Sequence, residues 1–273
     1  MSRMIDRLLF WRGPRIAVVE LHGILASRLG ALNLKSAGPV LKAAFGATAR
    51  EGHLILDINS PGGSPVQSQL IADLIRREAE AKAVHVHAVI QDVGASGGYW
   101  LACAADSIQA NAMSVVGSIG VVGGGFGFAE LIGRHGIERR LYTAGENKAR
   151  LDPFSPERPE DVTFVRQLMA DIHDRFKDWV RSRRGARLTA PEERMFDGSF
   201  CLGSQALASG LIDGLGDVET LVQTLGGEKA RARLFRPQRR RGLLRLLPGM
   251  AARSVVEAAL DAAEERAGPQ LRA

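Results

Sequence analysis

The chain has 273 residues, of which 45% are hydrophobic, 24% are charged and 5% are aromatic, and its formal net charge is +6. A chain of this length can bury a full hydrophobic core, and its two cysteines, Cys103 and Cys201, exclude a disulfide framework and a zinc module with four close ligands. No run approaches about 18 consecutive apolar residues, so the sequence predicts neither a membrane-spanning helix nor a secretory signal. We therefore expect a cytoplasmic protein in a reducing compartment.

The positive charge is concentrated near one end of the chain. Residues 229–253 contain nine basic side chains and no acid, so the rest of the chain carries −3. We interpret residues 229–273 as a basic tail with a short C-terminal helix, either a solvated linker or a surface for anionic lipid or another subunit. Nucleic acid is not expected as a partner, because Phe235 is the only aromatic residue there for base stacking.

Residues 1–14 form a separate segment in which apolar side chains are interleaved with arginines. Such a leader either packs on the domain or lies as a short helix on a membrane surface. The second interpretation, together with the basic tail, would add peripheral contact with the inner membrane surface to the cytoplasmic location.

The elements between these ends alternate between strands and helices. In chain order we expect strands at 15–21, 54–58 and 84–90, near 108, and at 115–122 and 138–142, with helices at 36–48, 66–82, 99–105, 129–135 and 156–184. Apolar residues recur at helical spacing in the helices, and β-branched runs mark the strands. This alternation predicts one α/β layered domain over residues 15–228 with buried, largely parallel strands.

Two glycine-rich turns each follow a predicted strand and precede a predicted helix: NSPGGS at 59–64 and GASGG at 94–98. Paired glycines let backbone amides approach a ligand closely, as an oxyanion hole requires. Ser96 in the second turn would present its hydroxyl at a strand-to-helix junction. Each turn alone also fits a phosphate-binding or purely structural role, but the two together favour acyl transfer.

A serine nucleophile needs a base. The GxSxG pattern around Ser96 suggests the nucleophile elbow of an α/β-hydrolase, whose triad histidine follows later in the chain. The downstream histidines, His135 and His173, are instead predicted at the end of one helix and inside another. Lys148 is the alternative base, and it would require burial that lowers its pKa from about 10.4 toward 7–8. On these residues alone, a surface role for Lys148 stays open.

Other chemistry has weaker signals. His85 and His87 lie on one face of a predicted strand but have no evident third ligand, so no metal site is expected. Residues 123–127 lack the full dinucleotide fingerprint, and no cofactor is expected. Cys103 is interpreted as a packing residue.

The chain resembles the signal peptide peptidase A family of serine proteases, and within it the short SohB-like members. The resemblance covers residues 16–217 and depends on several blocks in a fixed order. These are NSPGGS at 59–64, GASGGY at 94–99, AADSI at 104–108, VGSIGV at 116–121, AGENK at 144–148, FDGSF at 196–200, and a final block from Gly203 to Asp213.

This resemblance implies a serine endopeptidase with a Ser–Lys dyad that cleaves signal-peptide-like or other hydrophobic peptides. Ser96 would be the nucleophile, Lys148 the general base and Ser118 the residue that orients the lysine, with the amides of Gly63 and Gly97 as the oxyanion hole. The implied fold is the crotonase- and Clp-protease-like ββα superhelix. The implied assembly is a homo-oligomeric ring in which neighbouring subunits share each site.

Two features depart from the family pattern, and other functions remain open. Many members carry an N-terminal membrane segment or signal, which this sequence does not predict. Glu146 and Arg150 flank Lys148 with opposite effects on its pKa. An acyl-CoA hydratase or thioesterase on the same fold would need a carboxylate pair, for which Asp92 supplies one half. A non-catalytic ring scaffold and, more remotely, a histidine-triad esterase are further alternatives.

Overall fold

The computed structural model describes residues 14–50 and 52–237 of the chain. The predicted leader, except residue 14, and the predicted tail beyond residue 237 lie outside the described residues. The chain divides into two compact units, whose described parts are residues 14–120 (except 51) with 174–237, and residues 121–173. Each unit is described separately.

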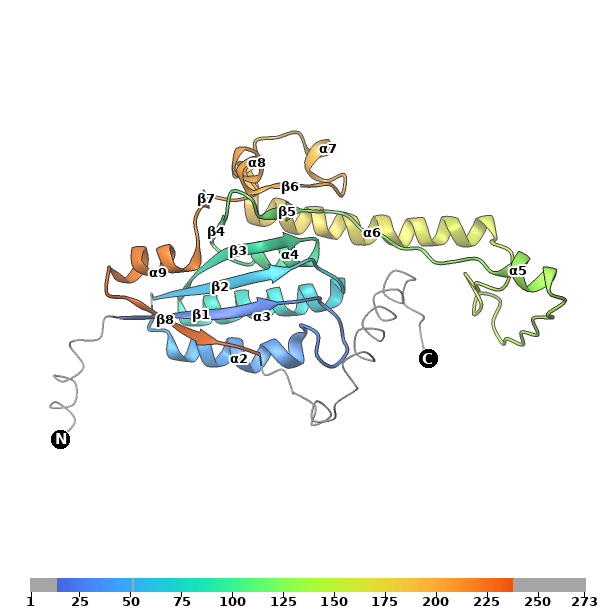
Figure 1. The fold of residues 1–273 in the computed structure, drawn as a ribbon, viewed down its shortest axis with the longest axis horizontal. Helices are drawn as coiled ribbons and strands as arrows, with labels where there is room; N and C mark the ends of the chain where they lie inside the picture. Colours follow the sequence, from blue (N-terminus) through green and yellow to red (C-terminus); the bar gives the residue numbers. More distant parts are fainter. Residues whose placement is uncertain (1–13, 51, 238–273) are drawn as a thin grey trace, which may run out of the picture. The chain divides into compact units, whose positions relative to one another are not determined.

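The first unit is built on an eight-stranded sheet (Figure 1). Its strands are β1 Arg15–His22, β2 His53–Ser60, β3 His85–Ala95, β4 Ser107–Ala110, β5 Val115–Gly117, β6 Phe200–Leu202, β7 Gly214–Leu215 and β8 Arg231–Phe235. They are ordered β6-β5-β3-β2-β1-β8, with β4 beside β3 and β7 beside β4. All of these pairs are parallel except β5 with β6. The predicted α/β class with a largely parallel sheet is confirmed.

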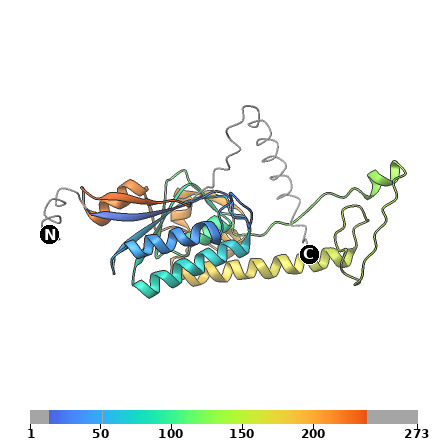
Figure 2. The ribbon, with the colours of Figure 1, turned by 90° about the horizontal axis from the view of Figure 1, so that it is seen from below.

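Helices cover both faces of this sheet (Figure 2). Helices α2 Leu34–Ala47, α3 Pro65–Lys82 and α4 Gly97–Ala102 lie on one face, and α9 Val218–Gly226 lies on the other. The remaining helices of this unit are α7 Glu192–Met195, α8 Gly203–Ala208 and the short 3₁₀ helix η1 Gly185–Arg187. Residues 174–184 belong to the long helix α6 Pro159–Arg184.

The side chains of β1 show how the two faces are filled. Val19 and Leu21 enter the larger core together with α2, α3 and α4, whereas Ile16 and Val18 pack with Leu221 and the rest of α9. Side chains alternate between the faces of a strand, so a strand covered on both faces needs apolar residues at successive positions. This is why residues 16–19 are a continuous apolar run.

Local signals place the helix starts. Asn33 caps α2, accepting a hydrogen bond from the Ser36 N–H while the Ser36 hydroxyl accepts one from the Asn33 N–H. Ser64 caps α3 with a single hydrogen bond, which its hydroxyl accepts from the Gln67 N–H at 3.4 Å. Pro65 takes the first helical position, where a missing N–H costs nothing. The first glycine-rich turn is thus followed by α3, and the second leads into α4 at Gly97, as the sequence predicts.

Three of the predicted strands differ clearly from the structure. The strand predicted at 84–90 continues to Ala95, so the second glycine-rich turn begins inside β3. The strand predicted at 115–122 ends at Gly117, because Ser118 adopts a positive φ of 52° that a strand cannot continue through. The strand predicted at 138–142 is absent, and that segment is exposed and irregular.

The division into a leader, a domain over 15–228 and a tail remains a prediction, but the sheet does not stop at residue 228. Residues 231–235 form β8, which pairs with β1 from Arg15↔Arg231 to Val19↔Phe235. The basic residues concealed this strand from sequence reasoning, because β8 is an edge strand whose arginines remain in solvent.

The second unit, residues 121–173, contains α5 Ala129–Arg134 and the first part of α6. No residue of α5 is buried. Asp161 is one buried group of this unit, and it accepts hydrogen bonds from Arg158 at 2.9 Å and lies 3.1 Å from Arg150. Phe128 and Phe154 pack against each other with ring centroids 5.6 Å apart.

Candidate active site

Ser96 occupies the junction between β3 and α4, as predicted. Its backbone has φ 50° and ψ −122°, a conformation that non-glycine residues rarely adopt. The Ser96 N–H donates to the Gly117 carbonyl at 2.8 Å, and the Ser96 carbonyl accepts from the Trp100 N–H at 3.0 Å. A strained, half-buried serine at a strand-to-helix turn is the geometry of a nucleophile elbow.

The structure brings the two glycine-rich turns together. A Cβ on Gly62 would lie 2.7 Å from the Ser96 Cβ and 2.6 Å from the Gly97 nitrogen, so only glycine permits this approach. The turns meet because β2 and β3 are adjacent parallel strands, with Ser60 paired to Gly94 at their carboxyl ends. The two turns therefore lie side by side because the sheet pairs β2 with β3.

Two backbone amides in these turns are candidates for an oxyanion hole. Gly63 lies between two hydrogen bonds to Leu25: the Leu25 N–H donates to the Gly62 carbonyl at 2.8 Å, and the Ser64 N–H donates to the Leu25 carbonyl at 2.6 Å. Gly97 begins α4, where the first N–H groups have no partner within the helix. Within the described parts of the chain, neither the Gly63 N–H nor the Gly97 N–H donates to a protein acceptor.

Ser118 leaves the neighbouring strand at the same level as Ser96. Ala95 pairs with Gly117 in the register of β3 and β5, so the two serines are the next residues of adjacent strands. Ser118 also has a positive φ, and its N–H donates to the Ser199 carbonyl at 2.7 Å. Two neighbouring serines in strained conformations mark this edge of the sheet as a candidate site.

Lys148 belongs to the second unit, whereas Ser96, Ser118, Gly63 and Gly97 belong to the first. It lies in an irregular segment, where its N–H donates to the Gly145 carbonyl at 3.2 Å, and its side chain is exposed. Its neighbour Arg150 pairs with Asp161 and lies 4.3 Å above the ring of Phe164.

A histidine group that sequence reasoning only half recognised lies at the other end of the strands. His53 joins His85 and His87, because His53 pairs with His85 across β2 and β3. The His53 Nδ1 and His87 Nε2 atoms are 3.0 Å apart, and His87 Nδ1 is 2.7 Å from the Ser107 hydroxyl. Burial, assisted by His53, lowers the pKa of His87 from 6.5 to about 4. The residues the structure describes contain no group of three side chains arranged to hold a metal ion.

Three further residues that the sequence analysis or the sheet register singles out, His22, Asp92 and Cys103, make the following contacts. His22 Nε2 lies 3.2 Å from Asp57 Oδ2. The other oxygen of this carboxylate, Oδ1, accepts a hydrogen bond from the Gln91 side-chain amide at 2.7 Å. Asp92 accepts a hydrogen bond from the Asn59 amide at 2.7 Å. Burial raises the pKa of Cys103 to about 12, as expected for the packing role predicted for this thiol.

Comparison with known proteins gives three informative relatives. The chain is 44% identical over 255 residues to a Brucella abortus protein named as the Na(+)/H(+) antiporter NhaA, covering 92% of this chain but only 34% of that protein. It is 31% identical to an inferred protease of Synechocystis, slr0021, covering 78% of this chain and 75% of that protein. It is 32% identical to the chloroplastic serine protease SPPA of Arabidopsis thaliana, covering 62% of this chain and 24% of that protein.

The α/β fold places a strained serine at a strand-to-helix turn, and the relatives from Synechocystis and Arabidopsis thaliana carry protease names. The sequence profile of Peptidase family S49 matches residues 78–231. The chain belongs to Peptidase family S49, and its resemblance to SppA- and SohB-type proteases is confirmed. None of the helices in the described ranges is long and apolar enough to cross a membrane.

Proposed function

We propose that the protein is a serine endopeptidase that uses Ser96 and Lys148 as a Ser–Lys dyad on a crotonase- and Clp-protease-like fold. The observation that carries this proposal is the strained Ser96 in the second glycine-rich turn, packed against Gly62 of the first turn. The substrate class is a signal-peptide-like or other hydrophobic peptide. A relative in Enterococcus faecium carries a signal peptide peptidase name, at 29% identity over 178 residues.

The reaction proceeds through an acyl-enzyme. The Ser96 Oγ attacks the carbonyl carbon of the scissile bond while Lys148 Nζ accepts the hydroxyl proton, which then passes to the leaving amine. The N–H groups of Gly63 and Gly97 donate to the carbonyl oxygen as it becomes negative. A water molecule then attacks the acyl-enzyme, with Lys148 accepting its proton, and Ser96 regains a hydrogen as the acid product leaves. No cofactor takes part.

Ser118 is proposed to orient Lys148. It is a hydroxyl residue that leaves β5 beside Ser96. Its oxygen can accept a hydrogen bond from an ammonium group, and its O–H can donate one to a neutral amine. The base must be neutral to accept a proton, so Lys148 requires a desolvated position that its exposed place in the single chain does not supply.

A homo-oligomeric ring would supply that position, with a lysine from one subunit and a serine from its neighbour. The second unit supports this arrangement because it exposes large apolar side chains. These are Val122, Phe126, Phe128, Leu131, Ile137, Leu141, Tyr142, Leu151, Phe154, Phe164 and Leu168. Apolar side chains in such number mark an interaction surface, and a second copy of this chain is the partner we propose. The protomer alone would then be nearly inactive.

The cytoplasmic location and the contact of leader and tail with the inner membrane surface remain part of this proposal. The acyl-CoA alternative is less favoured, since the curated relatives include several proteases. The non-catalytic scaffold is also less favoured, because both dyad residues are present.

The dyad is tested by intact mass after reaction with a fluorophosphonate, which transfers its phosphonyl group to an activated serine and releases fluoride. We expect one adduct on the wild type and none on Ser96→Ala or Lys148→Ala. Lys42→Ala, which removes an exposed lysine from α2, is the matched control and should react like the wild type. Labelling that survives Lys148→Ala would point to another base. An unlabelled wild type would refute the activated serine.

A further inference from the structure

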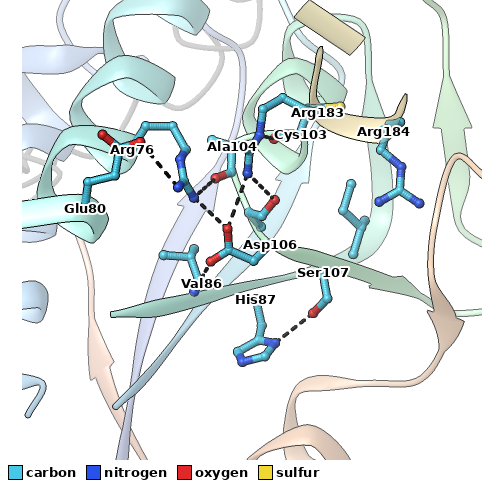
Figure 3. Close-up of polar contacts among 12 residues, drawn as sticks. Arg76, Glu80, Val86, His87, Cys103, Ala104, Asp106, Ser107, Arg183 and Arg184 are labelled. Atoms are coloured by element: carbon cyan, nitrogen blue, oxygen red, sulfur yellow. Dashed lines mark hydrogen bonds and ion pairs between the residues drawn. The ribbon is translucent and has the colours of Figure 1, made fainter. Parts of the chain in front are cut away.

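The three residues that follow α4 are held by side chains from two other helices, α3 and α6 (Figure 3). All six residues of α4 are buried, and so are Cys103, Ala104 and Ala105 after it, so the carbonyls of these three residues need hydrogen-bond partners within the protein. The Cys103 carbonyl accepts from Arg183 Nε at 2.9 Å, and the Ala105 carbonyl accepts from the same guanidinium at 3.1 Å. The Ala104 carbonyl accepts from Arg76 Nη1 at 3.2 Å.

Asp106 joins the two arginines to β3. Its Oδ1 accepts from Arg76 at 2.8 Å and lies 3.4 Å from Arg183, while its Oδ2 accepts from the Val86 N–H at 2.9 Å. Burial alone would raise the pKa of Asp106, but the Val86 hydrogen bond and the two guanidinium groups outweigh burial and lower it. The carboxylate is therefore ionised at neutral pH and holds both cations (Figure 3).

Arg76, Asp106 and Arg183 contact the two elements that meet at Ser96. Ser96 is the joint between β3 and α4, and Val86 lies near the start of β3 while Cys103–Ala105 follow the end of α4. The group thus fixes the far ends of the two elements that meet at the serine. Two guanidinium groups at the carbonyl end of a helix also oppose its negative dipole end.

We propose that Arg76, Asp106 and Arg183 form a clamp that positions the nucleophile Ser96 and the Gly97 N–H through α4. This inference rests on the proposed role of Ser96. The clamp residues are positioning residues that act through backbone carbonyls behind α4. Loosening them allows α4 to shift, and a displacement of about 1 Å at a reacting group costs up to about 100-fold in rate.

The variants are chosen to change the hydrogen bonds of the clamp and little else. Arg183→Gln removes the guanidinium, whereas Arg183→Lys keeps the charge but has no planar pair of donors to reach both Cys103 and Ala105. Arg181→Gln is the matched control, since Arg181 lies on the same helix and pairs with Glu192 and Asp178 instead. Arg76→Lys tests the other side of the clamp with a milder change.

The full-length variants are reacted with the fluorophosphonate, and the time course gives the labelled fraction, the limiting rate constant and the half-saturating concentration. Arg183→Gln should lower the limiting rate constant about tenfold with a half-saturating concentration within about twofold of wild type. Arg183→Lys and Arg76→Lys should be intermediate, and Arg181→Gln should match the wild type. A purely structural role would instead lower the labelled fraction and leave the rate constant of the reacting protein unchanged.

Two outcomes would refute the clamp proposal and leave the dyad proposal standing. One is a wild-type limiting rate constant in both Arg183→Gln and Arg76→Lys, and the other is a lowered labelled fraction with an unchanged rate constant. Absence of labelling in the wild type overturns the proposed function itself, and the clamp inference with it. If Arg183→Gln does not fold, the rate constant of Arg76→Lys decides between these outcomes.

Discussion

The histidine group at the start of β2 and β3 makes folding stability depend on pH in a defined direction. His87 has a pKa of about 4 in the folded protein against 6.5 in an unfolded chain, because it is half-buried and lies beside His53 and His85, with Asp106 partly opposing them. As the pH falls below 6.5 the unfolded chain takes up the proton first. The stability contributed by neutral His87 is therefore full above pH 6.5 and is lost as the pH falls toward 4.

The magnitude follows from the two pKa values. Between pH 7 and pH 4.5 their difference corresponds to a loss of about 2.4 kcal/mol in the free energy of unfolding. The His87 side chain is only half-buried, and the nearby solvent screens its interactions, so we expect about 1 kcal/mol. Replacing His87 with glutamine, which is neutral throughout, should remove this part of the pH dependence.

The assay is urea unfolding at pH 7 and pH 4.5, at one protein concentration, for the wild type and His87→Gln. His135→Gln is the matched control, since His135 is exposed at the end of α5 and should leave the wild-type pH dependence intact. The wild type should lose about 1 kcal/mol more than His87→Gln between the two pH values. Equal losses in the two proteins would refute the assignment of this pH dependence to His87.

Two further predictions concern buried polar groups of the first unit. Arg184, whose side chain is almost fully buried, forms two hydrogen bonds with Asp213 and two with the Gly210 carbonyl. Arg184→Leu should lower the free energy of unfolding by about 3–5 kcal/mol, measured by urea unfolding, and a loss below about 1 kcal/mol would contradict this. Asn33 caps α2, and its side-chain amide also donates to the carbonyls of three residues in the loop before it. Asn33→Ala should cost about 2–3 kcal/mol in the same assay, whereas an unchanged midpoint would show that the loop does not need this residue.

The parts of the fold that could be predicted from sequence are those in which the local pattern and the final packing agree. The apolar runs of β1, β2 and β3 are buried on both faces. Helix α3 buries Ile71, Leu74 and Ile75 of the stripe that its periodicity marks, whereas Val66 and Leu70 at its start are exposed. The two glycine-rich turns could also be placed together, because adjacent parallel strands end at the same edge of a sheet.

Elsewhere the pattern was misleading because partners distant in sequence decide the structure. Residues 138–142 have strand-like composition, but they pair with no strand in the described structure. His53 could have been found only from the register that pairs it with His85. Arg183 lies in an arginine-rich last helical turn, which is usually exposed, yet it donates hydrogen bonds to backbone carbonyls about 80 positions earlier in the chain.

The residue types of the candidate site could be predicted from the sequence, but their backbone conformations and the position of Lys148 could not. The block around Ser96 and the turn containing Gly63 identify two of its parts without any structure. The strained backbones of Ser96 and Ser118 become visible only in three dimensions, since φ depends on the hydrogen bonds to Gly117 and Ser199. In the proposed ring, Lys148 would join them from a neighbouring subunit, which the local sequence around Lys148 does not show.

Strand β8 has a practical consequence for anyone who shortens this protein. A chain cut at residue 228, where composition suggests that the domain ends, would lose residues 231–235 and leave one side of β1 without its hydrogen-bonding partner. β1 is a largely apolar strand, and an unprotected strand of that kind recruits other chains edge to edge. The arginines of β8, at positions 231 and 233, now occupy that border and discourage such stacking. Insoluble material from the shorter chain would thus reflect an opened sheet border and carry no information about the peptidase chemistry.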